Sequence, residues 1–283
     1  MRGLAGKVAV VTGGGSGIGA ATARYLADSG VAVVVVDIDG ASAARVASDL
    51  HRAVAVAGDV SEESAVERYM AKAVDHFGRV DLYHLNAGIA GAPALFPEVT
   101  ADDYDRVMGV NVRGVFLGMR AALRQFSRQA EGGAIVVTAS IAAQGGSADG
   151  VPYHVSKHAL IGLARCGAIY GGPLGIRVNA VAPGLVPTNM GRAAGGAGAR
   201  LAPIGVRARA TPLRRPGTAS EVAAVVGFLL SDEAGFVTYS TRQGARGGSP
   251  VATERRRRPC RTVDGSVRCS AGGPRRRRLG RQT

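Results

Sequence analysis

The sequence predicts an α/β protein, with one doubly wound parallel sheet and helices on both faces of it. Two observations predict this class: short apolar, β-branched runs alternate with longer helical patterns, and each run is followed by glycine or polar residues. Such alternation gives right-handed crossovers between parallel strands, with ligands beyond the carboxyl ends of the strands. The 283 residues, 46% of them apolar, suffice for a single domain, which we expect over residues 1–240.

A glycine-rich turn follows the first predicted strand, residues 7–12, and precedes a helical pattern over residues 20–29. This order brings backbone N–H groups and the positive end of a helix to a pyrophosphate. Glycine matters because any Cβ would hold the phosphate away. The alternative is a merely flexible loop. We expect dinucleotide contacts from Gly13, Gly15, Ser16, Gly17, Ile18 and Gly19.

The second predicted strand, residues 31–36, ends at Asp37 and Ile38. A carboxylate at this place accepts hydrogen bonds from the adenosine ribose hydroxyls and repels a 2′-phosphate. No Arg or Lys lies in residues 14–18 or 38–40, where a 2′-phosphate would need one. The alternative is an ordinary polar cap at the end of a strand. The sequence therefore favours NAD over NADP as the cofactor.

Two further strands are predicted over residues 54–57 and 81–85, and Ser61 is predicted to cap the helix between them. Because the carboxyl ends of parallel strands meet at one edge of a sheet, the residues that follow these strands are expected beside the glycine turn. These residues are Asp59, Val60, Asn86, Ala87 and Gly88.

A tyrosine and a lysine four residues apart, Tyr153 and Lys157, lie in a predicted helix. At this spacing they project from the same face, so an ammonium can stabilise the phenolate and lower a tyrosine pKa that is ordinarily about 10. The alternative is an aromatic side chain packed beside a solvated lysine. Ser140, just after the predicted strand 134–138, would face the same crevice. The pattern predicts a tuned acid/base.

The pattern changes after a sixth predicted strand, residues 176–181. Residues 185–217 are rich in glycine and proline and are predicted to form a mobile lid, with a disordered loop as the alternative. A capping box at residues 218–221 then begins a helix over residues 222–230. Residues 239–248 lack the alternation of a buried strand, so we expect them outside the sheet or at an irregular edge.

Residues 6 to about 238 resemble the short-chain dehydrogenase/reductase family, in its shorter, single-domain branch with a Rossmann fold. The resemblance rests on Thr12-Gly13-x-x-x-Gly17-x-Gly19, Asp59-Val60, Asn86-Ala87-Gly88, Pro183-Gly184 with Thr188, and the tetrad Asn111, Ser140, Tyr153 and Lys157. It implies hydride transfer between NAD(H) and an alcohol/ketone pair.

The resemblance also implies roles. Tyr153 would give or take the hydroxyl proton, and Ser140 would hydrogen-bond the carbonyl oxygen. Lys157 would bind the nicotinamide ribose and lower the tyrosine pKa, and Asn111, in the long helical region 101–129, would hold a water on the proton path. Cofactor contacts would also come from Asp59, Val60, Asn86, Ala87, Gly88, Pro183, Gly184, Val186 and Thr188. A small-molecule substrate, hydrophobic or mid-sized, would meet Ser140, Ala142, Gln144, Tyr153, Gly184, Leu185 and Met190.

The tail, residues 241–283, departs from the family. It carries 13 arginines against two acids, so that only +3 of the net charge of +14 remains for residues 1–240. The folded part therefore implies no nucleic-acid partner. The tail cannot bury a core and is expected to be disordered from about Ser249 onward. It is either a natural basic segment or, as we favour, the product of a reading-frame change.

Assembly and location follow from the same features. In the family, a seventh strand and the helix before it build a tetramer interface. Because that strand is missing or replaced here, we expect a homodimer rather than a homotetramer. Three scattered cysteines predict neither a disulfide framework nor a metal site. No signal peptide precedes Val8–Val11, and no apolar run reaches the roughly 18 residues of a membrane span, so a cytoplasmic protein without a membrane partner is expected.

A second hypothesis comes from a different class of function. The altered C-terminus could loosen the substrate side and leave a non-catalytic NAD-binding or redox-sensing module. The presence of both Tyr153 and Ser140 argues against it, because a pure binder has no need of the pair.

Overall fold

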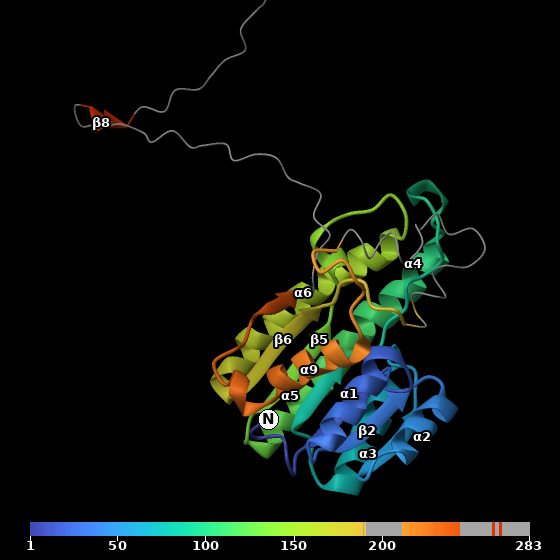
Figure 1. The fold of residues 1–283 in the computed structure, drawn as a ribbon, viewed down its shortest axis with the longest axis vertical. Coiled ribbons are helices and arrows are strands. Elements are labelled where there is room, and N and C mark those ends of the chain that lie inside the picture. The colour runs from blue at the N-terminus through green and yellow to red at the C-terminus, as the bar shows by residue number, and fades with distance from the viewer. Residues whose placement is uncertain (189, 191–210, 244–261, 264–265, 268–283) are drawn as a thin grey trace, which may run out of the picture. The chain divides into compact units, whose positions relative to one another are not determined.

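The computed structural model describes residues 1–188, 190, 211–243, 262–263 and 266–267. The chain separates into two compact units, Met1–Gly248 and Ser249–Thr283. The first unit contains the fold and the site described below, and Figure 1 shows its helices packed on both faces of one sheet.

A parallel sheet of seven strands forms the centre of the described part of the first unit, in the order β3-β2-β1-β4-β5-β6-β7. The strands are rich in valine and alanine, which suits a sheet buried on both faces. Strand order reverses between β1 and β4, and open α/β sheets bind ligands at such a point. The bounds are β1 (Val8–Thr12), β2 (Ala32–Asp37), β3 (Ala53–Ala57), β4 (Leu82–Leu85), β5 (Gly133–Thr138), β6 (Ile176–Ala182) and β7 (Thr241–Gln243).

Helices cover both faces of this sheet (Figure 1). On one face α1 packs against α9 and α2, and on the other α5 packs between α3 and α6. The helices are α1 (Gly17–Asp28), α2 (Gly40–Ser48), α3 (Glu63–Phe77), α4 (Ala101–Met108), α5 (Gly114–Gln129), α6 (Val151–Gly171) and α9 (Ala219–Leu230). Short 3-10 turns lie at Phe96–Glu98, Ile141–Gln144, Gly172–Leu174 and Asp232–Ala234.

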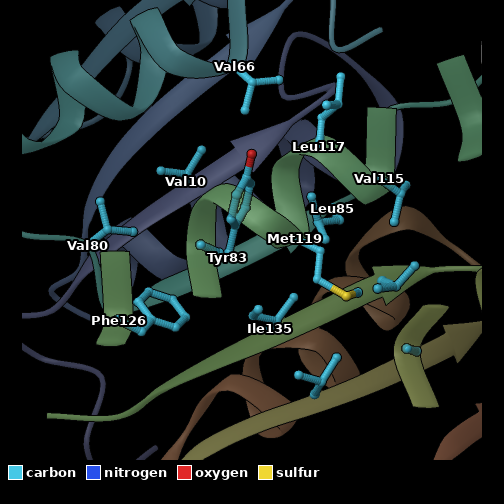
Figure 2. Close-up of a cluster of buried hydrophobic side chains, with 14 of the residues drawn as sticks. Val10, Val66, Val80, Tyr83, Leu85, Val115, Leu117, Met119, Phe126 and Ile135 are labelled. Carbon is cyan, nitrogen blue, oxygen red and sulfur yellow. The ribbon is translucent and has the colours of Figure 1, made fainter. Parts of the chain in front are cut away.

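Alternate residues of each strand enter two separate hydrophobic cores. Val10 of β1 belongs to the core under α3, α5 and α6, whereas its neighbour Ala9 belongs to the core under α1, α2 and α9. Figure 2 shows part of the first core, where Tyr83 of β4 lies near Phe126 of α5. Burial of each side chain of this size contributes about 1.5–3 kcal/mol to the free energy of folding. The two cores thus fix rigid elements, and the loops at the strand ends are held by them.

The long helical region predicted over residues 101–129 is interrupted. α4 ends at Met108, a π-helical turn spans Gly109–Arg113, and α5 follows it. Asn111 lies in this wider turn with its side chain fully buried. A π-helical turn inserts one residue into the helix and re-aims side chains, and the apolar period of the sequence does not reveal so small a change.

Two predicted helix starts have different outcomes. The capping box is confirmed: the Thr218 hydroxyl accepts from the Glu221 N–H, and the Glu221 carboxylate accepts from the Thr218 N–H. The prediction that Ser61 caps α3 is wrong, because the cap residue is Glu62. Ser61 instead donates its N–H and hydroxyl to the carboxylate of Asp59, an alternative that serine side chains offer at such turns.

The seventh strand is a short edge strand, so residues 241–243 follow the edge alternative for residues 239–248 and do not lie outside the sheet. β7 has three residues and pairs with the end of β6. Arg177 of β6 donates to three carbonyls at the end of α9, and Asn179 donates to the carbonyl of Val237. These bonds hold the chain on its way to β7. Because β7 begins at residue 241, these three residues belong with the sheet and not with the predicted tail.

Two sequence predictions fall mainly outside the described residues. Of the predicted lid over residues 185–217, positions 189 and 191–210 lie outside them. Of the tail from residue 249 onward, only β8 (Thr262–Val263) and β9 (Ser266–Val267) are described, and these pair antiparallel.

Candidate functional site

A cavity of about 680 Å³ lies at the carboxyl ends of the strands, around the point where strand order reverses. It contains most of the residues that the sequence nominates. Those that line it are Gly13, Ser16, Gly17, Ile18, Asp37, Ile38, Asp59, Val60, Asn86, Ala87, Gly88, Ser140, Tyr153, Lys157, Pro183, Gly184, Val186, Thr188 and Met190. The nominated residues that do not line it are Gly15, Gly19, Asn111, Ala142, Gln144 and Leu185.

The turn between β1 and α1 depends on glycine at several positions. Gly13 and Gly17 have φ angles of +63° and +53°, in the left-handed region that other residues rarely adopt. A Cβ on Gly19 would lie 2.0 Å from the carbonyl oxygen of Gly13, so this position packs the helix start directly on the turn. Gly19 therefore supports the turn by allowing this close packing, although it does not line the cavity.

Asp37 is fixed by the same turn. Its Oδ2 accepts the N–H of Gly15 at 2.9 Å, and its Oδ1 accepts the N–H of Asp39 at 3.1 Å. A Cβ on Gly15 would come within 2.9 Å of Oδ2. Gly15 thus orients the Asp37 carboxylate, which lines the cavity. Gly15 contributes to the site in this way although it does not line the cavity itself.

Asn86 joins the glycine turn to β4 and β5. Its Nδ2 donates to the carbonyl of Thr12 at 3.1 Å, and its Oδ1 accepts the hydroxyl of Thr138 at 3.1 Å. The Thr12 hydroxyl accepts the N–H groups of Asn86 and Ala87. These bonds hold the chain after β4 against the glycine turn.

Asn111 is buried behind the cavity. Its Oδ1 accepts the N–H of Ile89 at 2.8 Å, and its Nδ2 donates to the carbonyl of Ile89 and to the hydroxyl of Ser156, each at 2.9 Å. Both amide hydrogens are used by the protein. The described contacts give the Asn111 side chain a structural role, tying the loop after β4 to α6.

Tyr153 and Lys157 share one face of α6, as their spacing predicts. Lys157 is 2% exposed, its Nζ lies 5.5 Å from the centre of the Tyr153 ring, and it donates to the carbonyl of Thr138 at 2.9 Å. Ser140, at the start of the next turn, accepts the N–H of Ala142. Three elements, β5, the turn after it and α6, thus bring these groups to one wall of the cavity.

The electrostatics of this wall differ from the simple expectation. Burial raises the pKa of Tyr153, and a hydrogen bond with Ser140 only partly lowers it. Burial also lowers the pKa of Lys157 to about 8. Desolvation of the phenol therefore sets the direction of the tyrosine shift in the protein alone, and the lowering of the tyrosine pKa by Lys157 stays a prediction.

The substrate contacts are only partly brought together. Ala142 and Gln144 lie on the turn after Ser140 but do not line the cavity, and Leu185 lines a smaller neighbouring cavity of about 220 Å³. Sequence reasoning missed Thr138 and Ala139 as lining residues, although their place directly before Ser140 could have indicated them. It also missed Gly58, Arg106 and Val110, which carry no signal in a single sequence.

Two classes of site are absent from the described residues. Among them, no three His, Cys, Asp or Glu side chains are grouped so that they could hold a metal ion. In the same part of the chain, no helix has both the length and the apolar character needed to cross a membrane.

Comparisons with known proteins agree with this geometry. The family model described as enoyl-(acyl carrier protein) reductase matches residues 13–243. Levodione reductase of Leifsonia aquatica is 38% identical over 244 residues, 82% of this chain and 90% of the relative. Cis-4-hydroxycyclohexanecarboxylate dehydrogenase of Sinomonas cyclohexanicum is 42% identical over 242 residues, which cover 83% of this chain and 93% of the relative.

A solved structure is also similar. NAD+-bound xylitol dehydrogenase superposes with a TM-score of 0.80 at 34% identity, and the match covers 87% of this chain and 100% of that one.

Proposed function

Because the chain belongs to the short-chain dehydrogenase/reductase family, we propose that it interconverts a secondary alcohol and a ketone with NAD(H), with Tyr153 as general acid and base. The observation that carries the proposal is the convergence of Ser140, Tyr153 and Lys157 on the cavity that also contains the glycine turn. NAD(H), when bound, supplies or accepts the hydride. The protein supplies orientation and the proton.

The proton chemistry belongs to one wall of the cavity. Burial keeps Tyr153 protonated at neutral pH, and a neutral phenol is the form that can donate a proton to the oxygen of a ketone. Ser140, beside it, would donate a hydrogen bond to that oxygen as negative charge develops. Lys157, close to the ring, would favour the phenolate that remains.

The part of the cavity that Asp37 lines favours NADH over NADPH. Two backbone N–H groups hold the Asp37 carboxylate at the rim of the cavity, where it can accept from ribose hydroxyls and would repel a 2′-phosphate. The glycine turn and the positive end of α1 suit the pyrophosphate. The relative that is named as NAD+-bound supports the same choice.

The substrate is proposed to be a hydrophobic or mid-sized alcohol. Several of the residues that line the same cavity as Ser140 and Tyr153 are small or apolar, among them Ala90, Pro93 and Met190. Two relatives are named for a levodione and for a hydroxycyclohexanecarboxylate, so cyclic ketones are the first probes to try.

We propose a cytoplasmic homodimer that forms through α5 and α6. Apolar side chains that are open to solvent on these helices support it, namely Phe116, Val155, Ile169 and Tyr170. Mass measurement by light scattering tests the state. A stable tetramer or a monomer contradicts it.

The function is tested with a panel of ketones, cyclohexanones included, followed by the absorbance of NADH. We expect at least one ketone to consume NADH and the reaction with NADPH to be at least about tenfold weaker. Tight NADH binding with no turnover across the panel would instead favour the non-catalytic binding module.

A further inference from the structure

His84 is a fully buried histidine that the proposed chemistry does not use. It lies on β4 with 0% exposure, between β1 and β5. Its neighbours Tyr83 and Leu85 belong to the core under α5, so its own side chain points to the opposite face of the sheet. Burial lowers its pKa to about 3, so the imidazole is neutral in the folded protein.

The direction of its hydrogen bond follows from its neighbours. His84 Nε2 lies 2.8 Å from the hydroxyl of Thr138. The single hydroxyl hydrogen of Thr138 is donated to Asn86 Oδ1, because the amide nitrogen of Asn86 is directed at the carbonyl of Thr12. Thr138 must therefore accept from His84, which requires the proton on Nε2.

Thr138 connects the two halves of the site. Its hydroxyl binds the Asn86 side chain, which in turn braces the glycine turn. Its carbonyl accepts from Lys157 Nζ at 2.9 Å. Thr138 also lines the cavity. Whatever fixes Thr138 therefore fixes the lysine and the amide together.

The imidazole is kept at a cost. With the proton on Nε2, Nδ1 is an acceptor, and it is one of two buried side-chain polar atoms without a hydrogen-bond partner among the described residues. An unpaired buried acceptor destabilises a protein, and a leucine would fill the same space without this cost. Among the described residues, the hydrogen bond that offsets this cost is the one from His84 Nε2 to Thr138.

We propose that His84 is a positioning residue, which orients Thr138 and through it holds Lys157 and Asn86 in their places for the reaction. This inference rests on the proposed function. It assigns no contact between His84 and substrate or cofactor, and its whole effect is transmitted by the Nε2–H of a neutral imidazole.

Two substitutions of His84 distinguish the effect of its hydrogen bond from the effect of its side-chain volume. His84→Leu fills the space and removes the donor. His84→Gln keeps a donor, because its amide nitrogen lies the same number of bonds from Cα as Nε2 does. With a ketone that the wild type reduces, we expect kcat to fall about fivefold in the Leu variant, the factor of one neutral hydrogen bond. The Gln variant should stay within about twofold of the wild type.

The stability measurements should not follow the rates. We expect the urea midpoint of the Leu variant to equal or exceed that of the wild type. Tyr83→Phe is the matched control. Tyr83 lies on β4 beside His84, but its side chain points to the other face of the sheet, where its buried hydroxyl bonds the hydroxyl of Tyr69. This substitution should lower the urea midpoint and leave kcat unchanged. Equal kcat for the Leu variant and the wild type, or equal losses in the Leu and Gln variants, would overturn the proposal.

A readout without turnover keeps this inference separate from the proposed function. The chain has five histidines and three lysines, so nitrogen NMR can resolve His84 and Lys157. We expect a neutral imidazole with its proton on Nε2, and a Lys157 Nζ resonance that moves in His84→Leu but not in His84→Gln. A proton on Nδ1, or a Lys157 resonance that is the same in all three proteins, contradicts the proposal even if no ketone is reduced.

Discussion

The cofactor side and the substrate side of the cavity are built in different ways. Residues 12–88 meet the cavity through backbone geometry: left-handed glycines, main-chain N–H groups, and an aspartate held by two of them. Residues 138–190 meet it through side chains on a turn, a helix and the start of a loop. The first region is therefore determined by a few obligatory residues, whereas the second can change its lining without changing the fold.

The largest effect should come from the backbone-built side. Gly19→Ala places a Cβ 2.0 Å from the Gly13 carbonyl oxygen, and neither backbone segment can yield without moving the turn. We expect NADH affinity, measured by fluorescence titration, to fall more than about a hundredfold. A hundredfold loss corresponds to about 3 kcal/mol of binding free energy, which displacement of the turn would exceed. Gly162→Ala, in α6 with no atom near the new Cβ, is the control. It should bind NADH normally and be more stable by about 0.5–1 kcal/mol.

The buried lysine should give the next largest effect. Its pKa is about 8 in the folded protein and 10.5 in the unfolded one. Between these values the unfolded chain binds a proton that the folded protein does not, so stability rises with pH, by roughly 3 kcal/mol in total. Below pH 8 both states are protonated and the term is constant.

Lys157→Met should therefore remove the rise between pH 8 and 10.5 in urea unfolding experiments. Lys72→Met, at an exposed position of α3, is the matched control and should retain it. A rise that persists unchanged in the Lys157 variant would mean that this ammonium is not desolvated as described.

The smallest effect concerns the choice of cofactor. Asp37→Asn keeps an oxygen for the Gly15 N–H but removes the charge that opposes a 2′-phosphate. The preference for NADH over NADPH, at least about tenfold in the wild type, should narrow to near unity, a change of about 1.4 kcal/mol. Asp39→Asn, a carboxylate that caps α2, should leave the preference unchanged. Affinities for the two cofactors that are already equal in the wild type would refute the role of Asp37.

Much of the fold and of the cofactor side could be predicted because each prediction rested on a local rule. The strand–glycine–helix order, the Asp37 position and the Thr218 capping box all depend on neighbours in sequence. The π-helical turn at Asn111 was not predicted, because tertiary bonds to Ile89 fix that residue. The predicted Ser61 cap is wrong, because Ser61 bonds Asp59 instead.

The electrostatics could not be predicted from spacing alone. A separation of four residues places Tyr153 and Lys157 on one face of α6, and the structure confirms it. Burial decides the direction of both pKa shifts, and burial depends on the whole fold. The same reason hid His84, because only the packed sheet shows that its Nε2 meets Thr138.

The most direct test of the proposed reaction is the steady-state reduction of a ketone from the panel by Tyr153→Phe. We expect turnover to fall below detection while NADH still binds with wild-type affinity, because the substitution removes the proton donor and leaves the glycine turn and Asp37 untouched. A Phe variant that retains most of the wild-type kcat would contradict the assignment of Tyr153 as general acid and base.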